Sequence, residues 1–156
     1  MPSALAVAVL AGGQSRRMGR DKALLPLGST SLLQRVIDAA EPLSAEHLLI
    51  SNTPQAHGHF GWPVKTDEYP GLGPLGGLYT ALCHTGAPHL LLLACDLPNL
   101  NTPFLRFLSG QTGSHEAVVP ANTNGLQPLC ALYNRRILPT IKKAISANKL
   151  GMRQLL

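Results

Sequence analysis

Short, uninterrupted apolar segments alternate along this chain with segments whose apolar residues recur every three or four positions. The uninterrupted segments predict buried strands, and they cover residues 5–10, 47–51, 64–65, 89–94, 117–119 and 129–133. The periodic segments predict helices over residues 31–40, 75–84, 102–109 and 134–151. Strands that are apolar throughout and separated by helices are typical of a mostly parallel central sheet with helices on both faces. We therefore expect a three-layer, Rossmann-like α/β fold in which residues 1–156 form a single domain with one core.

The composition argues against a disordered protein and against a membrane-spanning one. Hydrophobic residues make up 45% of the chain and charged residues 13%, which is too apolar for a disordered protein. The run Leu90–Ala94 is far too short to span a bilayer, and the start of the chain lacks the features of a signal peptide. We therefore expect a cytoplasmic protein. Cys83, Cys95 and Cys130 have no Cys-x-x-Cys spacing and are predicted to be buried thiols.

The net charge of +5 is concentrated in two places. One basic cluster is Arg16, Arg17, Arg20 and Lys22, and the other lies between residues 135 and 153. Basic chains can bind nucleic acid, but only 4% of the residues are aromatic, so a base-stacking platform is not expected. A small anionic substrate explains the first cluster better, whereas the second fits the solvated face of a helix.

The most informative segment is residues 10–22, Leu-Ala-Gly-Gly-Gln-Ser-Arg-Arg-Met-Gly-Arg-Asp-Lys, directly after the first strand. Gly12 and Gly13 let the backbone approach a ligand closely, and successive N–H groups there can hold phosphate oxygens. Arg17 and Lys22 add the positive charge that a triphosphate requires. Because Ala23 follows Lys22, the segment is not a P-loop, and its glycine spacing does not match the dinucleotide fingerprint.

Polar residues also follow three later strands, where ligands of such sheets bind. Asp96 follows the strand 89–94, and a carboxylate there suits magnesium, which prefers one or two carboxylates together with substrate phosphates. Its structural alternative is a cap for the turn before Pro98. Asp67 precedes a glycine-rich entry to a helix at Gly73, and it is equally explained as a surface turn residue. Residues 51–52, Ser-Asn, end another strand, and residues 124–125, Asn-Gly, are typical of a hairpin turn.

At residues 10–22 the chain resembles the molybdenum cofactor guanylyltransferases of the nucleotidyltransferase superfamily. It matches their motif Leu-Ala-Gly-Gly-x-Ser-x-Arg-Met-Gly-x-Asp-Lys completely, and similar Gly-Pro-Leu-x-Gly and Cys-Asp-x-Pro segments extend the resemblance over nearly the whole chain. The resemblance implies catalytic roles for Lys22, Arg17 and Asp96, with Mg²⁺ bound by Asp96. It implies nucleotide contacts from Leu10, Ala11, Gly12, Gly13, Lys22, Ser51 or Asn52, Asp67, Gly73 and Asp96. It also places the segment 124–129 near the molybdopterin acceptor.

The implied reaction is attack by the terminal phosphate of molybdopterin on the α-phosphorus of GTP, with release of pyrophosphate. Transient complexes with other molybdenum cofactor proteins would follow from that role. Three alternatives remain at this stage: a cytidylyltransferase or other nucleotidyltransferase of the same superfamily, a GTP-binding protein without activity, and a nucleic-acid-binding module. The second arises because family members usually continue with a further strand and helix, whereas this sequence stops at Leu156.

Overall fold

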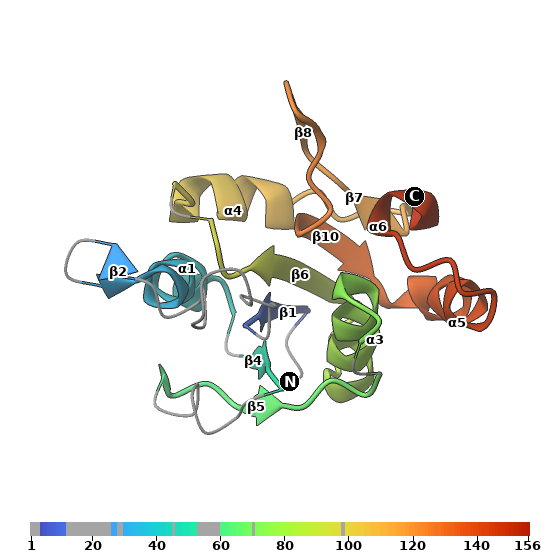
Figure 1. The fold of residues 1–156 in the computed structure, drawn as a ribbon. Coiled ribbons are helices and arrows are strands. Elements are labelled where there is room, and N and C mark those ends of the chain that lie inside the picture. Colours follow the sequence, from blue (N-terminus) through green and yellow to red (C-terminus); the bar gives the residue numbers. More distant parts are fainter. Residues whose placement is uncertain are drawn as a thin grey trace.

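A six-stranded sheet forms the middle layer of the protein (Figure 1). The computed structural model describes residues 4–11, 26–27, 30–44, 46–52, 60–69, 71–97 and 99–156. In sheet order β5-β4-β1-β6-β10-β7, the strands are Val64–Lys65, Glu46–Ile50, Leu5–Leu10, His89–Ala94, Cys130–Asn134 and Ala117–Val118. Two short antiparallel pairs lie outside it: β2 (Pro26–Leu27) with β3 (Thr30–Ser31), and β8 (Ala121–Asn122) with β9 (Gly125–Leu126).

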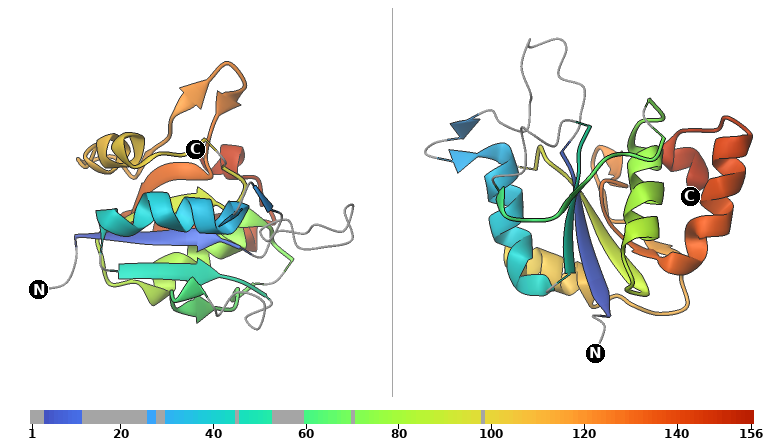
Figure 2. Two further views of the ribbon diagram at one scale, coloured as in Figure 1. Left: turned by 90° about the vertical axis from the view of Figure 1, so that its left-hand side faces the viewer. Right: turned by 90° about the horizontal axis from the view of Figure 1, so that it is seen from below.

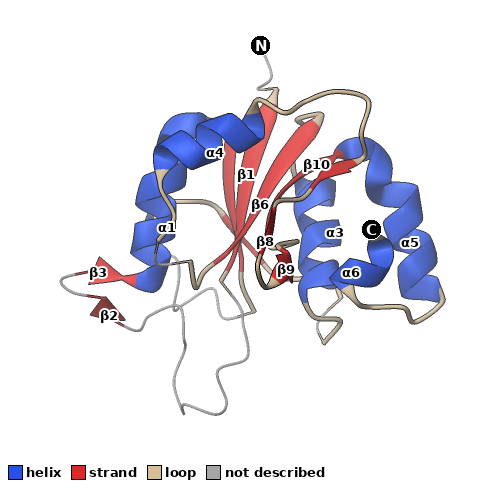
Figure 3. Cartoon of the chain, turned by 90° about the horizontal axis from the view of Figure 1, so that it is seen from above, coloured by secondary structure: helices blue, strands red, loops and turns tan. Residues whose placement is uncertain are grey.

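Helices cover both faces of the sheet, as the views from below and from above show (Figures 2 and 3). One face carries α1 (Leu32–Ala40) and α4 (Thr102–Ser109). The other carries α3 (Pro74–His84), α5 (Leu138–Ser146) and α6 (Met152–Leu155). Among the described residues, short 3₁₀ turns lie at Glu41–Leu43 and Arg135–Ile137. The predicted three-layer α/β architecture is therefore confirmed.

The sheet is mostly parallel, as predicted. β1 pairs in parallel with β4 on one side and with β6 on the other, and β4 pairs in parallel with β5. β10 runs antiparallel to both of its neighbours, β6 and β7. The register places Leu10 opposite both Ile50 and Ala94, so the parallel strands end at one edge of the sheet.

The sheet divides the buried apolar side chains into two clusters, where the chain length had suggested one core. Successive residues of a strand point to opposite faces, and β6 follows this rule. Leu91 and Leu93 pack with α1 and α4, whereas Leu90 and Leu92 pack with α3 and α5. All four leucines are fully buried, which explains why this strand reads as continuously apolar.

The predicted end of the last long helix was wrong. The last long helix ends at Ser146, well before residue 151, because Asn148 adopts a positive φ of 56°. The N–H groups of Asn148 and Lys149 then donate to the carbonyls of Ile145 and Ala144 (3.1 and 2.8 Å), which is a Schellman end.

The prediction that all three cysteines are buried was wrong for one of them. Cys83 is exposed, although Cys95 and Cys130 are buried as expected. None of the helices that the structure describes combines the length and apolar character needed to cross a bilayer.

Candidate active site

The candidate residues that the structure describes gather where four neighbouring parallel strands end. Ala11 follows β1, residues 51–52 follow β4, Asp67 comes two residues after β5, and Asp96 comes two residues after β6. These strands are consecutive in the sheet, and each lies about 4.8 Å from the next. The whole row therefore extends over about 14 Å of one sheet edge. Four segments that are far apart in sequence are thus brought together along a single line.

The centre of this row is the point where the chain changes direction across the sheet. From β1 the chain passes to β4 and β5 on one side, and then returns to place β6 on the other side of β1. Ligands of open α/β sheets bind in the crevice at such a switch point. Ala11 is fully buried there, and its N–H donates to the Ile50 carbonyl (2.9 Å), which extends the β1–β4 ladder by one residue toward Gly12. The half-buried Leu10 precedes it at the end of β1.

Gly12, Gly13, Arg17 and Lys22 lie outside the described residues. The register nevertheless locates where their segment begins. Leu10 pairs with Ala94 across the β1–β6 ladder, so Ala11 and Asp96 both leave the sheet at the switch point. The predicted phosphate-binding segment therefore starts beside the strand that carries Asp96.

Asp96 is exposed and borders a cavity of about 410 Å³ beyond the sheet edge. Four amide side chains also line this cavity, from the β6–α4 connection (Asn99 and Asn101) and from the β8–β9 hairpin (Asn122 and Gln127). The hairpin projects from the layers in Figure 1 and forms part of the wall. The side chains of Phe104 on α4 and Cys130 on β10 add apolar surface. The cavity thus combines one carboxylate, several amides and an aromatic ring.

The amides of the hairpin hold its turn as well as facing the cavity. Asn122 Oδ1 accepts from the Asn124 N–H (2.8 Å) and from Gln127 Nε2 (3.1 Å). A hairpin turn is present as predicted, but it lies at residues 123–124, and Gly125 is already the first residue of β9. Asn101 is similarly engaged, because its Oδ1 accepts from the Phe104 N–H (2.9 Å) and caps α4. These hydrogen bonds fix the orientation of the polar lining.

The structure distinguishes between the two candidates at the end of β4. Ser51 is buried, with 1% of its surface exposed, and its N–H donates to the Lys65 carbonyl (2.9 Å). Asn52 is exposed. Because only Asn52 presents its side chain to solvent, it is the better placed of the two to contact a ligand.

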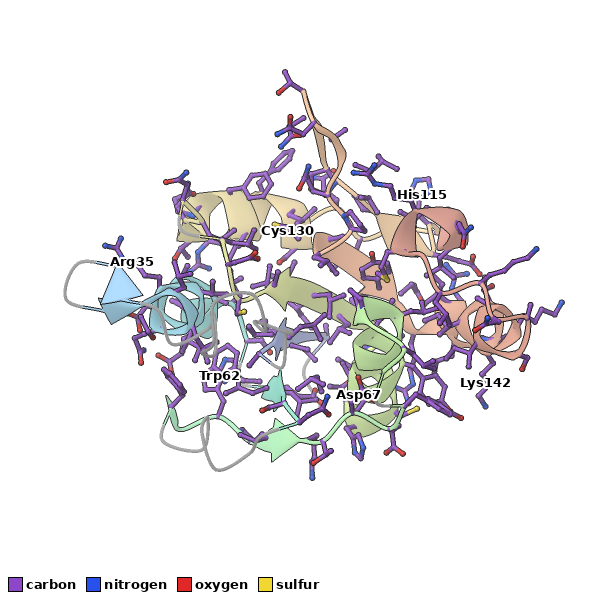
Figure 4. All side chains as sticks on the ribbon, viewed as in Figure 1. Arg35, Trp62, Asp67, His115, Cys130 and Lys142 are labelled. Carbon is purple, nitrogen blue, oxygen red and sulfur yellow. The ribbon has the colours of Figure 1, made fainter. Side chains whose placement is uncertain are left out.

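Asp67 is held in a defined orientation at the end of β5, next to α3 (Figure 4). Its Oδ1 accepts from the Tyr69 N–H (2.9 Å) and lies 3.2 Å from the Thr80 hydroxyl. Burial raises the pKa of the Asp67 carboxyl, the two hydrogen bonds oppose this shift, and nearby Glu68 adds a small further increase. The Tyr69 N–H contact is the one that a turn aspartate makes, and the Thr80 contact additionally ties the half-buried carboxylate to α3, so both interpretations of Asp67 stay open.

Gly73 is the residue before the first turn of α3, and its φ of +67° belongs to a region that side chains rarely adopt. A Cβ placed on Gly73 would meet no atom of the described residues within 4 Å. Among these residues, none packs against this side of the helix entrance. A helix N-terminus of this kind favours negatively charged groups.

The site residues suit positioning of phosphates rather than covalent catalysis. Burial raises the pKa of the Cys130 thiol to about 11, so this cysteine is protonated near neutral pH and is a poor nucleophile. Within the described ranges, no three His, Cys, Asp or Glu side chains are grouped so as to hold a metal ion. Magnesium does not require such a group, because substrate phosphates and water supply most of its ligands. An exposed carboxylate beside a cavity, such as Asp96, fits that donor set.

Sequence reasoning missed Thr80, Asn99, Asn101, Phe104 and Asn122. Asn101 carried a usable signal, because it precedes Thr102-Pro103 and Asn is favoured before a helix start. The others are recognisable only once β6, α4 and the β8–β9 hairpin are assembled around the cavity, and once α3 is packed against the end of β5.

Comparison with known proteins points to one family. The family model described as "MobA-like NTP transferase domain" matches residues 7–156. The chain is 38% identical to the probable molybdenum cofactor guanylyltransferase of Carboxydothermus hydrogenoformans over 145 residues, which are 93% of this chain and 73% of that protein. It is 32% identical to the molybdenum cofactor guanylyltransferase of Desulfosudis oleivorans over 146 residues, covering 91% and 71% of the two chains.

A solved structure shares the fold. The crystal structure of molybdopterin-guanine dinucleotide biosynthesis protein A from Archaeoglobus fulgidus superposes with a TM-score of 0.81. The match covers 96% of this chain and 77% of that one, at 23% sequence identity.

Proposed function

The chain belongs to the MobA-like NTP transferase domain family, and from this premise we propose that it transfers GMP from GTP to molybdopterin. The observation that supports this most directly is the row of residues at the ends of β5, β4, β1 and β6. A nucleoside triphosphate could lie along this row, with its nucleoside toward Asp67 and its phosphates toward the switch point. The named activity of the curated relatives supplies the choice of GTP and of the acceptor.

The nucleoside end of the proposed site is formed by Asn52, Asp67 and the entrance to α3 at Gly73. Within the part of the chain that the structure describes, Asp67 accepts its hydrogen bonds through Oδ1, so Oδ2 is the oxygen available to a hydroxyl of the ribose. None of the described residues lies within 4 Å of a Cβ placed on Gly73, which would let the nucleoside approach the backbone there.

The phosphate end of the proposed site is formed by the segment that starts at Ala11. Gly12 and Gly13 would offer backbone N–H groups, and Arg17 and Lys22 would offer positive charge to the triphosphate. An oxygen of the terminal phosphate of molybdopterin forms a bond to the α-phosphorus of GTP, and the bond from that phosphorus to the bridging oxygen breaks, so that pyrophosphate leaves. Because the acceptor phosphate is already a nucleophile, the protein has to position two anions and neutralise their charge.

Magnesium is proposed as the cofactor, held by Asp96. A bound Mg²⁺ would offset negative charge on the phosphates. Because Asp96 follows β6 at the switch point, it would hold the ion between the phosphate end of the site and the cavity.

The cavity beside Asp96 is the proposed site of the acceptor. Its amide side chains, together with Phe104, suit a flat heterocycle that carries many hydrogen-bonding atoms. Gln127 belongs to the segment that the family resemblance associates with molybdopterin. The acceptor phosphate would then approach the GTP from the side of Asp96.

Incubation of the purified protein with GTP, molybdopterin and Mg²⁺ tests this function directly. We expect a guanine dinucleotide by mass spectrometry and one equivalent of pyrophosphate, with neither product when Mg²⁺ is chelated. A parallel reaction with CTP separates this activity from that of a cytidylyltransferase. GTP binding without product would instead favour a nucleotide-binding protein, and no binding of either nucleotide would refute the proposal.

A further inference from the structure

Thr80 is a polar residue on the buried side of α3, with none of its surface exposed. It lies in the middle of the helix, in contact with the segment that follows β5. Its hydroxyl makes three close approaches: to the Glu68 N–H (2.7 Å), the Gly76 carbonyl (2.9 Å) and Asp67 Oδ1 (3.2 Å). Two of these three partners belong to the turn that carries Asp67.

A hydroxyl group has one hydrogen to donate and two lone pairs that accept, so the three contacts cannot all be of the same kind. The oxygen accepts from the Glu68 N–H, which ties the backbone of the turn to α3. The single hydrogen can be donated either to the Gly76 carbonyl or to Asp67 Oδ1. The carbonyl of a residue four positions earlier is a common partner of Thr in a helix, so the hydroxyl has a second acceptor when Asp67 does not take its hydrogen.

The turn is also packed closely against the first turn of α3. A Cβ on Gly76 would lie 2.9 Å from the Tyr69 carbonyl oxygen and 3.1 and 3.3 Å from the two carboxylate oxygens of Asp67. The carboxylate therefore rests directly on the helix backbone. With Oδ1 engaged by the Tyr69 N–H and the Thr80 hydroxyl, Oδ2 is the oxygen that the described residues leave for another partner.

We propose that Thr80 is a positioning residue for nucleotide binding, which holds the Asp67 carboxylate so that one oxygen remains available to the nucleotide. This inference rests on the proposed function, because it takes Asp67 as a nucleotide contact. Thr80 itself is fully buried and acts only through Asp67.

A purely structural role would have a different signature. If the Thr80 hydroxyl only satisfied nearby backbone groups, its removal would lower the stability of the protein. The affinity for a ligand would then be unchanged. Affinity for the nucleotide, measured separately from thermal stability and from the KM of the acceptor, therefore distinguishes the two roles.

The test compares Thr80→Val with Thr80→Ser by calorimetric titration with GTP and by steady-state kinetics. Val removes the hydroxyl, and we expect the Kd of GTP to rise about tenfold while the KM of molybdopterin stays within about twofold. Ser restores the hydroxyl, and its Kd should return to within about twofold of the original value. If Thr80→Val does not fold, Thr80→Cys provides the same comparison, because a thiol is a weak hydrogen-bonding group.

Thr85→Val is the matched control. Thr85 is also buried, it follows the last residue of the same helix, and its hydroxyl has no hydrogen-bond partner within the described structure. This variant should bind GTP as the unchanged protein does.

The decisive comparison is made in the background of Asp67→Ala. If Thr80 acts through Asp67, Thr80→Val should have no further effect on the Kd of GTP in that background. Equal GTP affinity of Thr80→Val and the unchanged protein, or an undiminished effect in the Asp67→Ala background, would overturn the inference alone. Failure of the unchanged protein to bind GTP would overturn the proposed function and this inference with it.

Discussion

A single atom and a single charge separate Asp96 from an asparagine, and the proposed chemistry depends on that difference. Asp96→Asn keeps the size of the side chain and one carbonyl oxygen, but it removes the charge proposed to hold Mg²⁺. We expect kcat to fall by about 10²- to 10³-fold, the usual cost of removing one group that stabilises developing charge. The affinity for GTP should change much less. Steady-state rates over a range of Mg²⁺ concentrations provide the measurement.

Asp38→Asn is the matched control for that prediction. Asp38 is exposed in the last turn of α1, which leads to the start of β4 and so lies at the opposite edge of the sheet. Its substitution should leave kcat and the Mg²⁺ dependence unchanged. If kcat of Asp96→Asn were within about threefold of the control, Asp96 would have no part in the proposed mechanism.

Asp67 should make the stability of the fold depend on pH. A carboxyl whose pKa is raised on folding holds its proton more tightly in the folded state. Its stabilising contribution is therefore complete below its ordinary pKa of 3.8 and is lost as the pH rises through the higher folded value. Asp67→Asn has no such titration, so it should have the higher Tm near pH 7, with the difference shrinking as the pH falls toward 4. A difference in Tm that is the same at every pH would contradict this account.

At the scale of elements, the start of α1 depends on one side chain. Ser31 accepts from the Gln34 N–H (3.1 Å) and caps the helix. Ser31→Ala should lower the free energy of unfolding by about 1 kcal/mol. That corresponds to a decrease in Tm of about 2–4 °C, with GTP affinity retained because Ser31 is not part of the proposed site.

The control for the capping variant is Ser146→Ala at the other end of a helix. Ser146 is the exposed last residue of α5, so its loss should change Tm by less than about 1 °C. Thermal denaturation followed by circular dichroism measures both variants. Equal Tm values for Ser31→Ala and the unchanged protein would show that the cap contributes little.

The elements that the sequence predicted well are those with a clear period or a recognisable start. The strand 5–10 and the helix 102–109 match the structure residue for residue, because a buried apolar run and a Thr-Pro start are local features. The direction of β10 could not be predicted, since an apolar run is the same for parallel and antiparallel pairing. The end of α5 was missed because Asn148 occupies the position that Gly more often takes.

The exposure of Cys83 could not be predicted from its residue type alone. Cys is usually buried, but Cys83 lies outside the stripe of Leu75, Leu78 and Leu82 that faces the core. The stripe itself was predicted correctly, and all three leucines are fully buried. The helical position therefore decides burial where the residue type alone misleads.

At the scale of the whole molecule, the sequence predicted which residues lie at the ends of the parallel strands, but not which elements surround them. Asp67 and Asp96 could be placed at one edge of the sheet because each follows a predicted strand, and parallel strands end at one edge; their roles stay predictions that the family resemblance implies. The β8–β9 hairpin could not be placed against Asp96, because its position depends on the order of strands in the sheet. The cavity is formed by residues 96–104 and 120–130, which no local pattern relates to one another.

Because the proposed site is distributed over four strand ends, GTP should stabilise the whole fold. A ligand that binds only the folded protein, at 100 times its Kd, adds about 2.7 kcal/mol to the free energy of unfolding. For a domain of this size that raises Tm by about 5–10 °C. Thermal shift measurements with GTP and Mg²⁺ should show this increase, and CTP at the same concentration should give less than half of it. Chelation of Mg²⁺ should reduce the increase in the unchanged protein but not in Asp96→Asn, since that variant lacks the proposed ligand. An equal response of the two proteins to chelation would mean that any magnesium bound with GTP is held without Asp96.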